Sequence, residues 1–160
     1  MISRRRNPTI ARERHTWDTA NSLDCHLSIE WAPMGRVALN GDRLEFPAAE
    51  PAPAVYRFRV QGGGSPERVY FGETDNLANR FSLYRNAHRS QVTNFLLKQL
   101  FLEALSSGHE IAVATVTPDA WIDFRGTRII ADFTSKFVRR IFENIAIVES
   151  HGTSVISLNR

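Results

Sequence analysis

The stretch that decides the fold lies at residues 54–72, which read AVYRFRV-QGGGSPE-RVYFG. In the first arm, two sets of residues alternate: Val55, Arg57 and Arg59 on one side, and Tyr56, Phe58 and Val60 on the other. Side chains of a strand point alternately to the two faces of its sheet, and a glycine-rich segment between two such runs is typical of a turn. These features predict a β-hairpin with arms at 54–60 and 68–72.

The segments around this hairpin complete an α+β pattern. Before it, β-like runs lie at 27–31, 36–39 and 43–46, and Asn40-Gly41-Asp42 suits a tight turn between the last two. After it, the spacing of apolar residues predicts a helix over 76–85 with Thr74 or Asp75 as N-cap, a helix over 91–105, a strand over 111–116 and a helix over 128–148. Strands and helices in this order predict an α+β layer rather than an alternating βαβ sheet.

The last predicted helix contains a carboxylate in an apolar setting. We expect its buried face to consist of residues one turn apart: Ile130, Phe133, Phe137, Ile141 and Ile145. Residues 141–148 read IFENIAIV, which is apolar on every side of a helix and so predicts a fully buried turn. A buried carboxylate at Glu143 needs a partner, either one of the arginines or a divalent cation. The sequence leaves both alternatives open.

Composition limits the class of protein. The chain has 160 residues, 42% of them hydrophobic and 23% charged, which are values of a folded globular domain. No apolar run is long enough to cross a membrane, and the basic N-terminus lacks the apolar region of a secretory signal. The single cysteine, Cys25, excludes an internal disulfide, and no histidines have ligand spacing for zinc. We therefore expect a cytoplasmic protein that does not bind membranes.

Basic charge is concentrated in two parts of the chain. Residues 1–14 contain five arginines and one glutamate, and residues 51–100 contain seven basic and three acidic residues. Arginine accounts for 18 of the 20 basic side chains, and its guanidinium binds phosphate through two parallel hydrogen bonds. This distribution favours a polyanionic partner, although an arginine-rich soluble surface explains the same composition.

Several of these residues together resemble the motifs of GIY-YIG nucleases. AVY at 54–56 and YFG at 70–72 resemble the two half-motifs that name the family, and Arg80 follows the second at the family's distance. Tyr84 one turn later, Glu143 within ENIAI, and Asn159 resemble the remaining motif positions. The resemblance covers residues 53–160 as a nuclease domain, preceded by a disordered arginine-rich arm at 1–14 and a β-rich extension with a proline-rich lead-in at 15–52.

The resemblance implies a small antiparallel β-sheet flanked by helices and a metal-dependent endonuclease that hydrolyses phosphodiester bonds of DNA. The implied catalytic residues are Tyr56, Tyr70, Arg80, Tyr84 and Glu143. Glu143 would hold a single Mg²⁺ or Mn²⁺ ion, with Glu149 as a rival ligand, and Tyr56 is the preferred general base among the three tyrosines. The expected nucleic-acid contacts are Arg57, Arg59, Arg85, His88 and Asn159.

Other interpretations of the same scaffold remain open. A non-catalytic module could bind nucleic acid without cutting it, and a nuclease of a toxin or defence system could depend on a partner for targeting. A homodimer would place two single-site centres on the two strands of a duplex. The identity of the substrate, whether a defined DNA site, a branched DNA or an RNA, is not encoded in these motifs.

Overall fold

The computed structural model describes residues 24–124, 126–151 and 153–159. The predicted arm at 1–14 and the first part of the extension lie outside the described residues. The elements in chain order are β1 (Cys25–Ser28), β2 (Trp31–Asn40), β3 (Arg43–Glu45), β4 (Ala54–Gln61), β5 (Arg68–Thr74), α1 (Leu77–Arg85), α2 (Val92–Ser106), β6 (Glu110–Val116), β7 (Trp121–Phe124), β8 (Thr127–Ile130), α3 (Lys136–His151) and β9 (Ile156–Ser157).

Two sheets organise these strands. The larger has the order β3-β2-β6-β4-β5-β9, antiparallel throughout except for the parallel pair β5 and β9. The smaller has the antiparallel order β1-β7-β8. The sequence-based expectation of a mixed α+β chain is confirmed, and strands β2 and β3 of the β-rich extension belong to the larger sheet itself.

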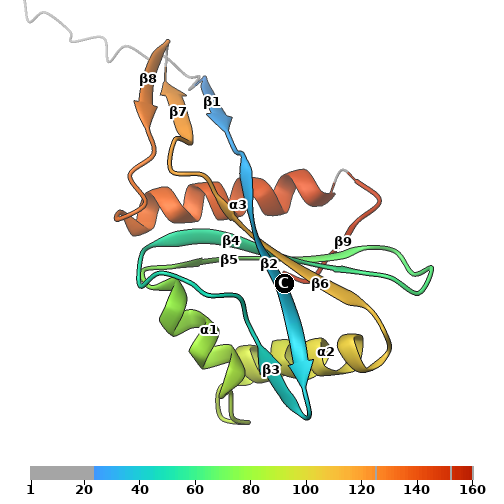
Figure 1. Cartoon of the computed structure of the whole chain (residues 1–160). Helices are drawn as coiled ribbons and strands as arrows, with labels where there is room; N and C mark the ends of the chain where they lie inside the picture. Colours follow the sequence, from blue (N-terminus) through green and yellow to red (C-terminus); the bar gives the residue numbers. More distant parts are fainter. Residues whose placement is uncertain (1–23, 125, 152, 160) are drawn as a thin grey trace, which may run out of the picture.

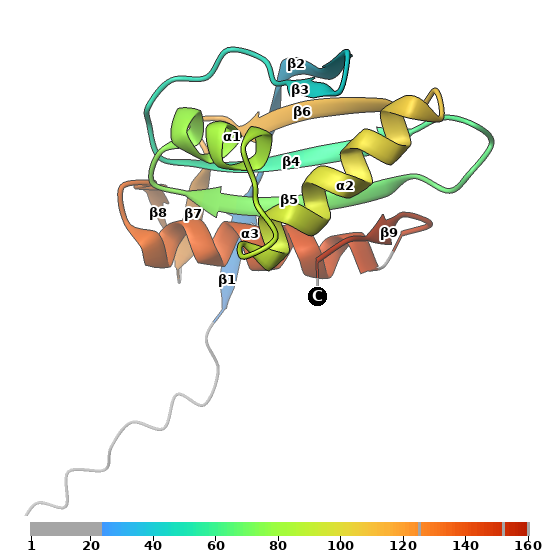
Figure 2. The ribbon, with the colours of Figure 1, turned by 90° about the horizontal axis from the view of Figure 1, so that it is seen from below.

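Helices cover both faces of the larger sheet. In Figure 1, α3 lies above the sheet and α1 and α2 lie below it, and Figure 2 shows α1 and α2 from their own side. The α1–α2 face contains the main core, to which β4 contributes Tyr56, Phe58 and Val60. On the α3 face, Val55 packs near Phe142, and Phe71 packs near Ala146. Alternating side chains of one hairpin therefore enter two separate cores, because each sheet face has its own helical cover.

The central hairpin is confirmed. Tyr56 lies opposite Gly72, and Tyr70 lies opposite Phe58, so the two tyrosines are diagonal rather than directly paired. The predicted N-cap of α1 was wrong by one or two residues. Asn76 is the cap, and its side chain accepts a 2.8 Å hydrogen bond from the backbone N–H of Asn79.

The last helix differs most from its prediction. Residues 127–130 form strand β8, and α3 begins only at Lys136. The residues expected to be buried are largely on the outside, with 83% of Phe137 and 59% of Ile130 exposed, and Ile141 and Ile145 are exposed as well. The side that meets the sheet consists instead of Arg139, Phe142, Ala146 and Ser150. The small side chains of Ala146 and Ser150 let the helix approach the sheet closely. Because Ile141 and Ile145 are exposed, the turn at 141–148 is not buried on every side.

Candidate active site

Most of the predicted catalytic residues meet at one edge of the larger sheet. Strand β5 pairs with β4 along its length, but β9 pairs only with Arg68 and Val69 at the start of β5. Beyond Phe71, the outer edge of β5 has no strand partner among the described residues. Helix α1 approaches this edge from one face of the sheet and α3 from the other (Figures 1 and 2).

Gly72 makes room for the Tyr56 side chain at this edge. A Cβ atom built on Gly72 would lie within 3.0 Å of the Cζ, Oη and Cε2 atoms of Tyr56, so any larger residue would displace the ring. Cross-strand neighbours on the same sheet face are close enough for this contact. The glycine of the YFG segment therefore fixes where the Tyr56 hydroxyl can lie.

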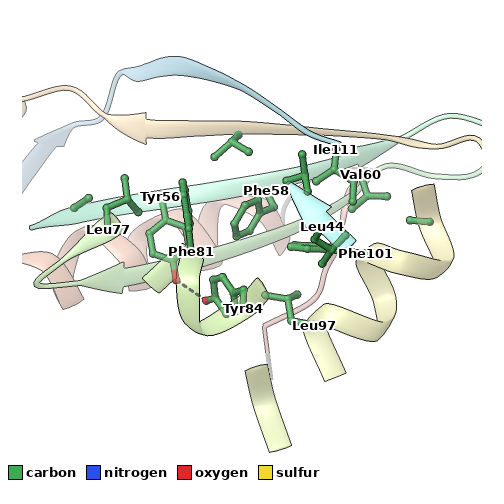
Figure 3. Packing of buried hydrophobic residues seen from close by; sticks show 14 residues of the cluster. Leu44, Tyr56, Phe58, Val60, Leu77, Phe81, Tyr84, Leu97, Phe101 and Ile111 are labelled. Carbon is green, nitrogen blue, oxygen red and sulfur yellow. Dashed lines mark hydrogen bonds between the residues drawn. The ribbon is translucent and has the colours of Figure 1, made fainter. Parts of the chain in front are cut away.

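The Tyr56 hydroxyl forms a buried hydrogen bond with Tyr84. The two oxygen atoms are 2.6 Å apart, and both side chains are almost completely buried (Figure 3). Burial raises the pKa of both tyrosines because an ionised phenolate loses its hydration there. For Tyr84, the nearby hydroxyls of Tyr56 and Tyr70 raise the pKa further. Both Tyr56 and Tyr84 are therefore held in the neutral form.

Tyr70 and Arg80 border this pair. Tyr70 is only partly buried, and its ring stacks on Phe58 with centroids 6.4 Å apart. Arg80, from α1, is also partly buried, and its Nε atom is buried with no hydrogen-bond partner among the described residues. Burial lowers the pKa of Arg80, but the hydroxyls of Tyr56, Tyr84 and Tyr70 oppose it and the net direction is upward. Arg80 is therefore a cation whose guanidinium can still donate hydrogen bonds.

Glu143 approaches the same place from α3. Its side chain is partly buried and forms no hydrogen bond or ion pair with any described residue, so none of the arginines that the structure describes forms the predicted salt bridge with it. Burial raises its pKa, and the neighbouring negative charge of Glu73 adds to this, whereas Arg140 and Arg80 oppose it. The carboxylate is thus close to other charges but has no partner of its own.

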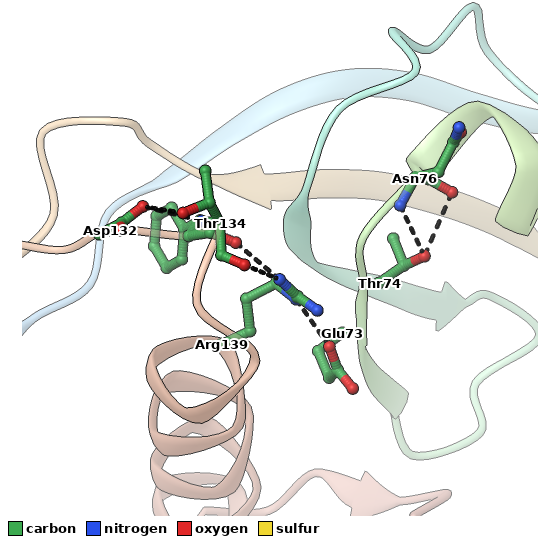
Figure 4. Close-up of polar contacts among 7 residues, drawn as sticks. Glu73, Thr74, Asn76, Asp132, Thr134 and Arg139 are labelled. Atoms are coloured by element: carbon green, nitrogen blue, oxygen red, sulfur yellow. Dashed lines mark hydrogen bonds and ion pairs between the residues drawn. The ribbon is translucent and has the colours of Figure 1, made fainter.

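A buried ion pair that the sequence motifs did not reveal anchors α3 to β5. Arg139 Nε donates a 2.7 Å hydrogen bond to Glu73 Oε2, and Arg139 Nη1 donates to the carbonyl oxygens of Phe133 and Thr134 at 2.8 and 3.0 Å (Figure 4). Glu73 directly follows the YFG segment in the sequence, and this position was the signal that could have identified it. Because Glu143 lies one helical turn after Arg139, the pair fixes the part of α3 that carries Glu143.

Two of the predicted nucleic-acid contacts lie on the wrong face of the sheet for this site. Arg57 and Arg59 alternate with Tyr56 along β4 and therefore point to the α3 face. Arg57 lies over the ring of Trp31 at 4.5 Å, and Arg59 forms a bidentate pair with Glu67 at 2.6 and 2.7 Å. Arg57 and Arg59 therefore lie on the other face of β4 from Tyr56, and their contact with nucleic acid stays a prediction.

The remaining predicted contacts are divided between the end of α1 and the end of the chain. His88 is exposed after α1, and Arg85 Nε donates a 3.3 Å hydrogen bond to the carbonyl oxygen of Leu44. The Asn159 amide accepts from Phe71 N–H and donates to Phe71 C=O, both at 2.8 Å. Asn159 thus extends the edge of β5 towards Gly72 and uses both its polar groups within the protein.

The described part of the chain has no helix long and apolar enough to span a membrane. It also has no group of three or more histidine, cysteine, aspartate or glutamate side chains placed to hold a metal ion. The chain has no significant match among protein-family models, curated proteins or solved structures.

Proposed function

We propose that this chain is a metal-dependent endonuclease of the GIY-YIG type that hydrolyses phosphodiester bonds of DNA. The observation that carries the proposal is the convergence of Tyr56, Arg80, Tyr84 and Glu143 at the open edge of β5. These side chains come from β4, α1 and α3, which are widely separated in sequence. A tyrosine pair, a guanidinium and a carboxylate, the last two without an ion-pair partner among the described residues, together match the needs of phosphodiester cleavage.

The residues present fit a divalent cation. The Glu143 carboxylate is partly buried without a counter-ion among the described residues, which is unfavourable unless a cation compensates it. Mg²⁺ and Mn²⁺ prefer oxygen ligands, and Mg²⁺ is commonly held by one or two carboxylates together with water and phosphate oxygens. Glu143 would hold the ion, which supplies positive charge next to the scissile phosphate when bound.

The protein side chains have separate tasks in this proposal. Arg80 donates hydrogen bonds to a phosphoryl oxygen, where negative charge increases in the transition state. Burial raises the pKa of Tyr56 and Tyr84, so both remain protonated and neither takes a proton from the attacking water. Their shared hydrogen bond instead orients the two hydroxyl groups. This counts against Tyr56 as the general base and favours Tyr70, which is not fully buried, as the tyrosine that meets the attacking water.

The DNA backbone would approach along α1. Arg80 and Arg85 lie on this helix, and the exposed His88 and Arg89 follow it. Contacts of these side chains with phosphates would position the duplex without reading its sequence.

A cleavage assay with two glutamate variants of the same helix tests the proposal. Supercoiled plasmid is incubated with Mg²⁺, with Mn²⁺ or with a chelator. We expect metal-dependent cleavage by the wild type, none by Glu143→Gln, and near-normal cleavage by Glu149→Gln, since Glu149 is exposed on α3. DNA binding should persist in all three proteins. Cleavage that survives in Glu143→Gln would refute the assigned role, and a folded wild type that binds DNA without cutting would favour the binding-module alternative.

The fall of the cleavage rate at low pH, the acid limb of the pH–rate profile, gives a further check on the role of Glu143. Because its pKa is raised, the metal-binding carboxylate form is lost on acidification at a higher pH than for an ordinary glutamate. Raising the metal concentration should move this limb to lower pH.

A further inference from the structure

The sheet face opposite Tyr56 contains a cavity lined by three arginines. Its volume is about 330 Å³, and Arg36, Arg57 and Arg59 line it together with Trp31, Pro33 and Ala114. These residues belong to β2, β4 and β6. Helix α3 packs on β4, β5 and β9, and of the cavity residues Trp31 belongs to the apolar clusters beneath this helix. No acidic side chain lines the cavity.

Arg57 is the arginine of this cavity that has no carboxylate partner among the described residues. Arg36 pairs with Glu110 at 2.8 Å, and Arg59 pairs with Glu67. Arg57 instead lies over the Trp31 ring, and its Nε atom is buried without a hydrogen-bond partner in the described part of the chain. A buried donor without a partner is unfavourable, and a bound oxyanion would satisfy it.

A second cavity on the far side of the same arginines helps to locate the anion. It has a volume of about 190 Å³, and Glu67 and Glu149 line it in addition to Arg57 and Arg59. The carboxylates that line the smaller cavity repel an anion, whereas no carboxylate of the described residues lines the larger one and its Arg57 has no carboxylate partner among them. An anionic ligand therefore belongs in the larger cavity.

We propose that the larger cavity binds a nucleotide unit, with its phosphate on Arg57 and its base against the apolar wall that includes Trp31. Guanidinium groups bind phosphate bidentately, and the apolar wall of the cavity suits the flat surface of a base. The volume is at the lower end of the range for small-ligand pockets. A free mononucleotide and one nucleotide of a single strand share this chemistry. The site shares no residue with the proposed nuclease centre, and its Arg57 points to the other face of β4 from Tyr56.

Titrations monitored by tryptophan fluorescence and calorimetry test this site. Inorganic phosphate, adenosine 5′-monophosphate, an oligothymidylate and a duplex are each added to the Glu143→Gln protein, so that cleavage cannot interfere. We expect a saturable signal from the mononucleotide or the single strand, weaker binding of phosphate alone, and loss of the fluorescence change in Trp31→Phe. The tighter of the first two ligands identifies the source of the nucleotide.

Charge-matched variants separate this site from general attraction. Arg57→Gln should weaken binding roughly 10- to 100-fold, the effect of losing a charge-assisted hydrogen bond. Arg43→Gln removes the same charge from an exposed position outside the cavity and should leave affinity unchanged. Arg57→Lys keeps the charge but not the two-pronged geometry, so it should bind weakly too. The absence of saturable binding at millimolar ligand, or equal losses in Arg57→Gln and Arg43→Gln, would overturn the proposal, with circular dichroism confirming that each variant is folded.

Discussion

Replacing Gly72 with alanine should destabilise this protein, although the same change in an ordinary strand is stabilising by roughly 0.4–1 kcal/mol. The added Cβ would lie 2.9 Å from Cε2 of Tyr56 and still closer to its Cζ and Oη atoms. The Tyr56 ring cannot simply move aside, because the rings of Phe58, Phe81 and Tyr84 surround it with centroids 5.6, 6.1 and 6.4 Å away.

Two effects set the magnitude. Overpacking a well-filled core costs about 1–3 kcal/mol. Displacing the ring also breaks the 2.6 Å hydrogen bond between Tyr56 and Tyr84, and the loss of this one buried bond costs about 1–3 kcal/mol. We therefore expect Gly72→Ala to lower the free energy of unfolding by about 2–6 kcal/mol.

Urea denaturation of a double-mutant cycle measures this effect. In a Tyr56→Leu background the obstructing ring is absent, so Gly72→Ala should cost less than about 1 kcal/mol. Gly64→Ala serves as a control, since its φ of +70° imposes strain but no atom lies within 4 Å of the new Cβ. It should cost about 1–2 kcal/mol in either background. A Gly72→Ala protein as stable as the wild type, or an equal loss with and without the ring, would refute the reasoning.

Three further changes test the surroundings of the site. Burial raises the pKa of Tyr84 above 10.0, so the stability that this pKa shift contributes is complete below pH 10 and is lost as the pH rises towards the folded-state pKa. Tyr84→Phe should therefore reduce the alkaline decline in the free energy of unfolding by up to about 1.4 kcal/mol per pH unit. An unchanged pH profile would contradict this. Arg139→Met leaves Glu73 as a buried unpaired charge and should cost about 3–5 kcal/mol, much of it recovered in the double variant with Glu73→Gln. Asn159→Ala should lower the free energy of unfolding by about 1–3 kcal/mol and accelerate hydrogen exchange at the Phe71 amide. Unaltered exchange there would argue against the two hydrogen bonds between the Asn159 side chain and the Phe71 backbone.

Local patterns predicted the central hairpin well. Strict alternation at 54–60 and a glycine-rich turn define β4 and β5, and Asn40-Gly41-Asp42 marks the turn between β2 and β3. The spacing of motif residues also identified side chains that the fold brings together, since Tyr56 and Tyr84 are hydrogen-bonded. Strand alternation and turn chemistry are local properties, and a single sequence records them directly.

The burial of α3 could not be predicted in this way. Its sheet-facing side uses Arg139, Ala146 and Ser150, which hydrophobic periodicity assigns to the surface. Arg139 can be buried only because Glu73, distant in the chain, neutralises it. Likewise, the alternation along β4 predicts that Arg57 and Tyr56 point to opposite faces of the sheet. Which helix covers each face depends on tertiary packing and cannot be derived from that pattern.

The position of Glu143 in the chain has a consequence for the order in which the site is assembled. Tyr56, Tyr70, Arg80 and Tyr84 all lie in one continuous stretch, β4 to α1, whose contacts close short loops. Glu143 joins them only when α3 docks on β5, and long-range contacts of this kind are slow to form. We expect an incompletely folded chain to bring the tyrosines and Arg80 together but to lack the Glu143 carboxylate beside them. If Glu143 holds the metal, cutting is therefore withheld until the whole domain is folded.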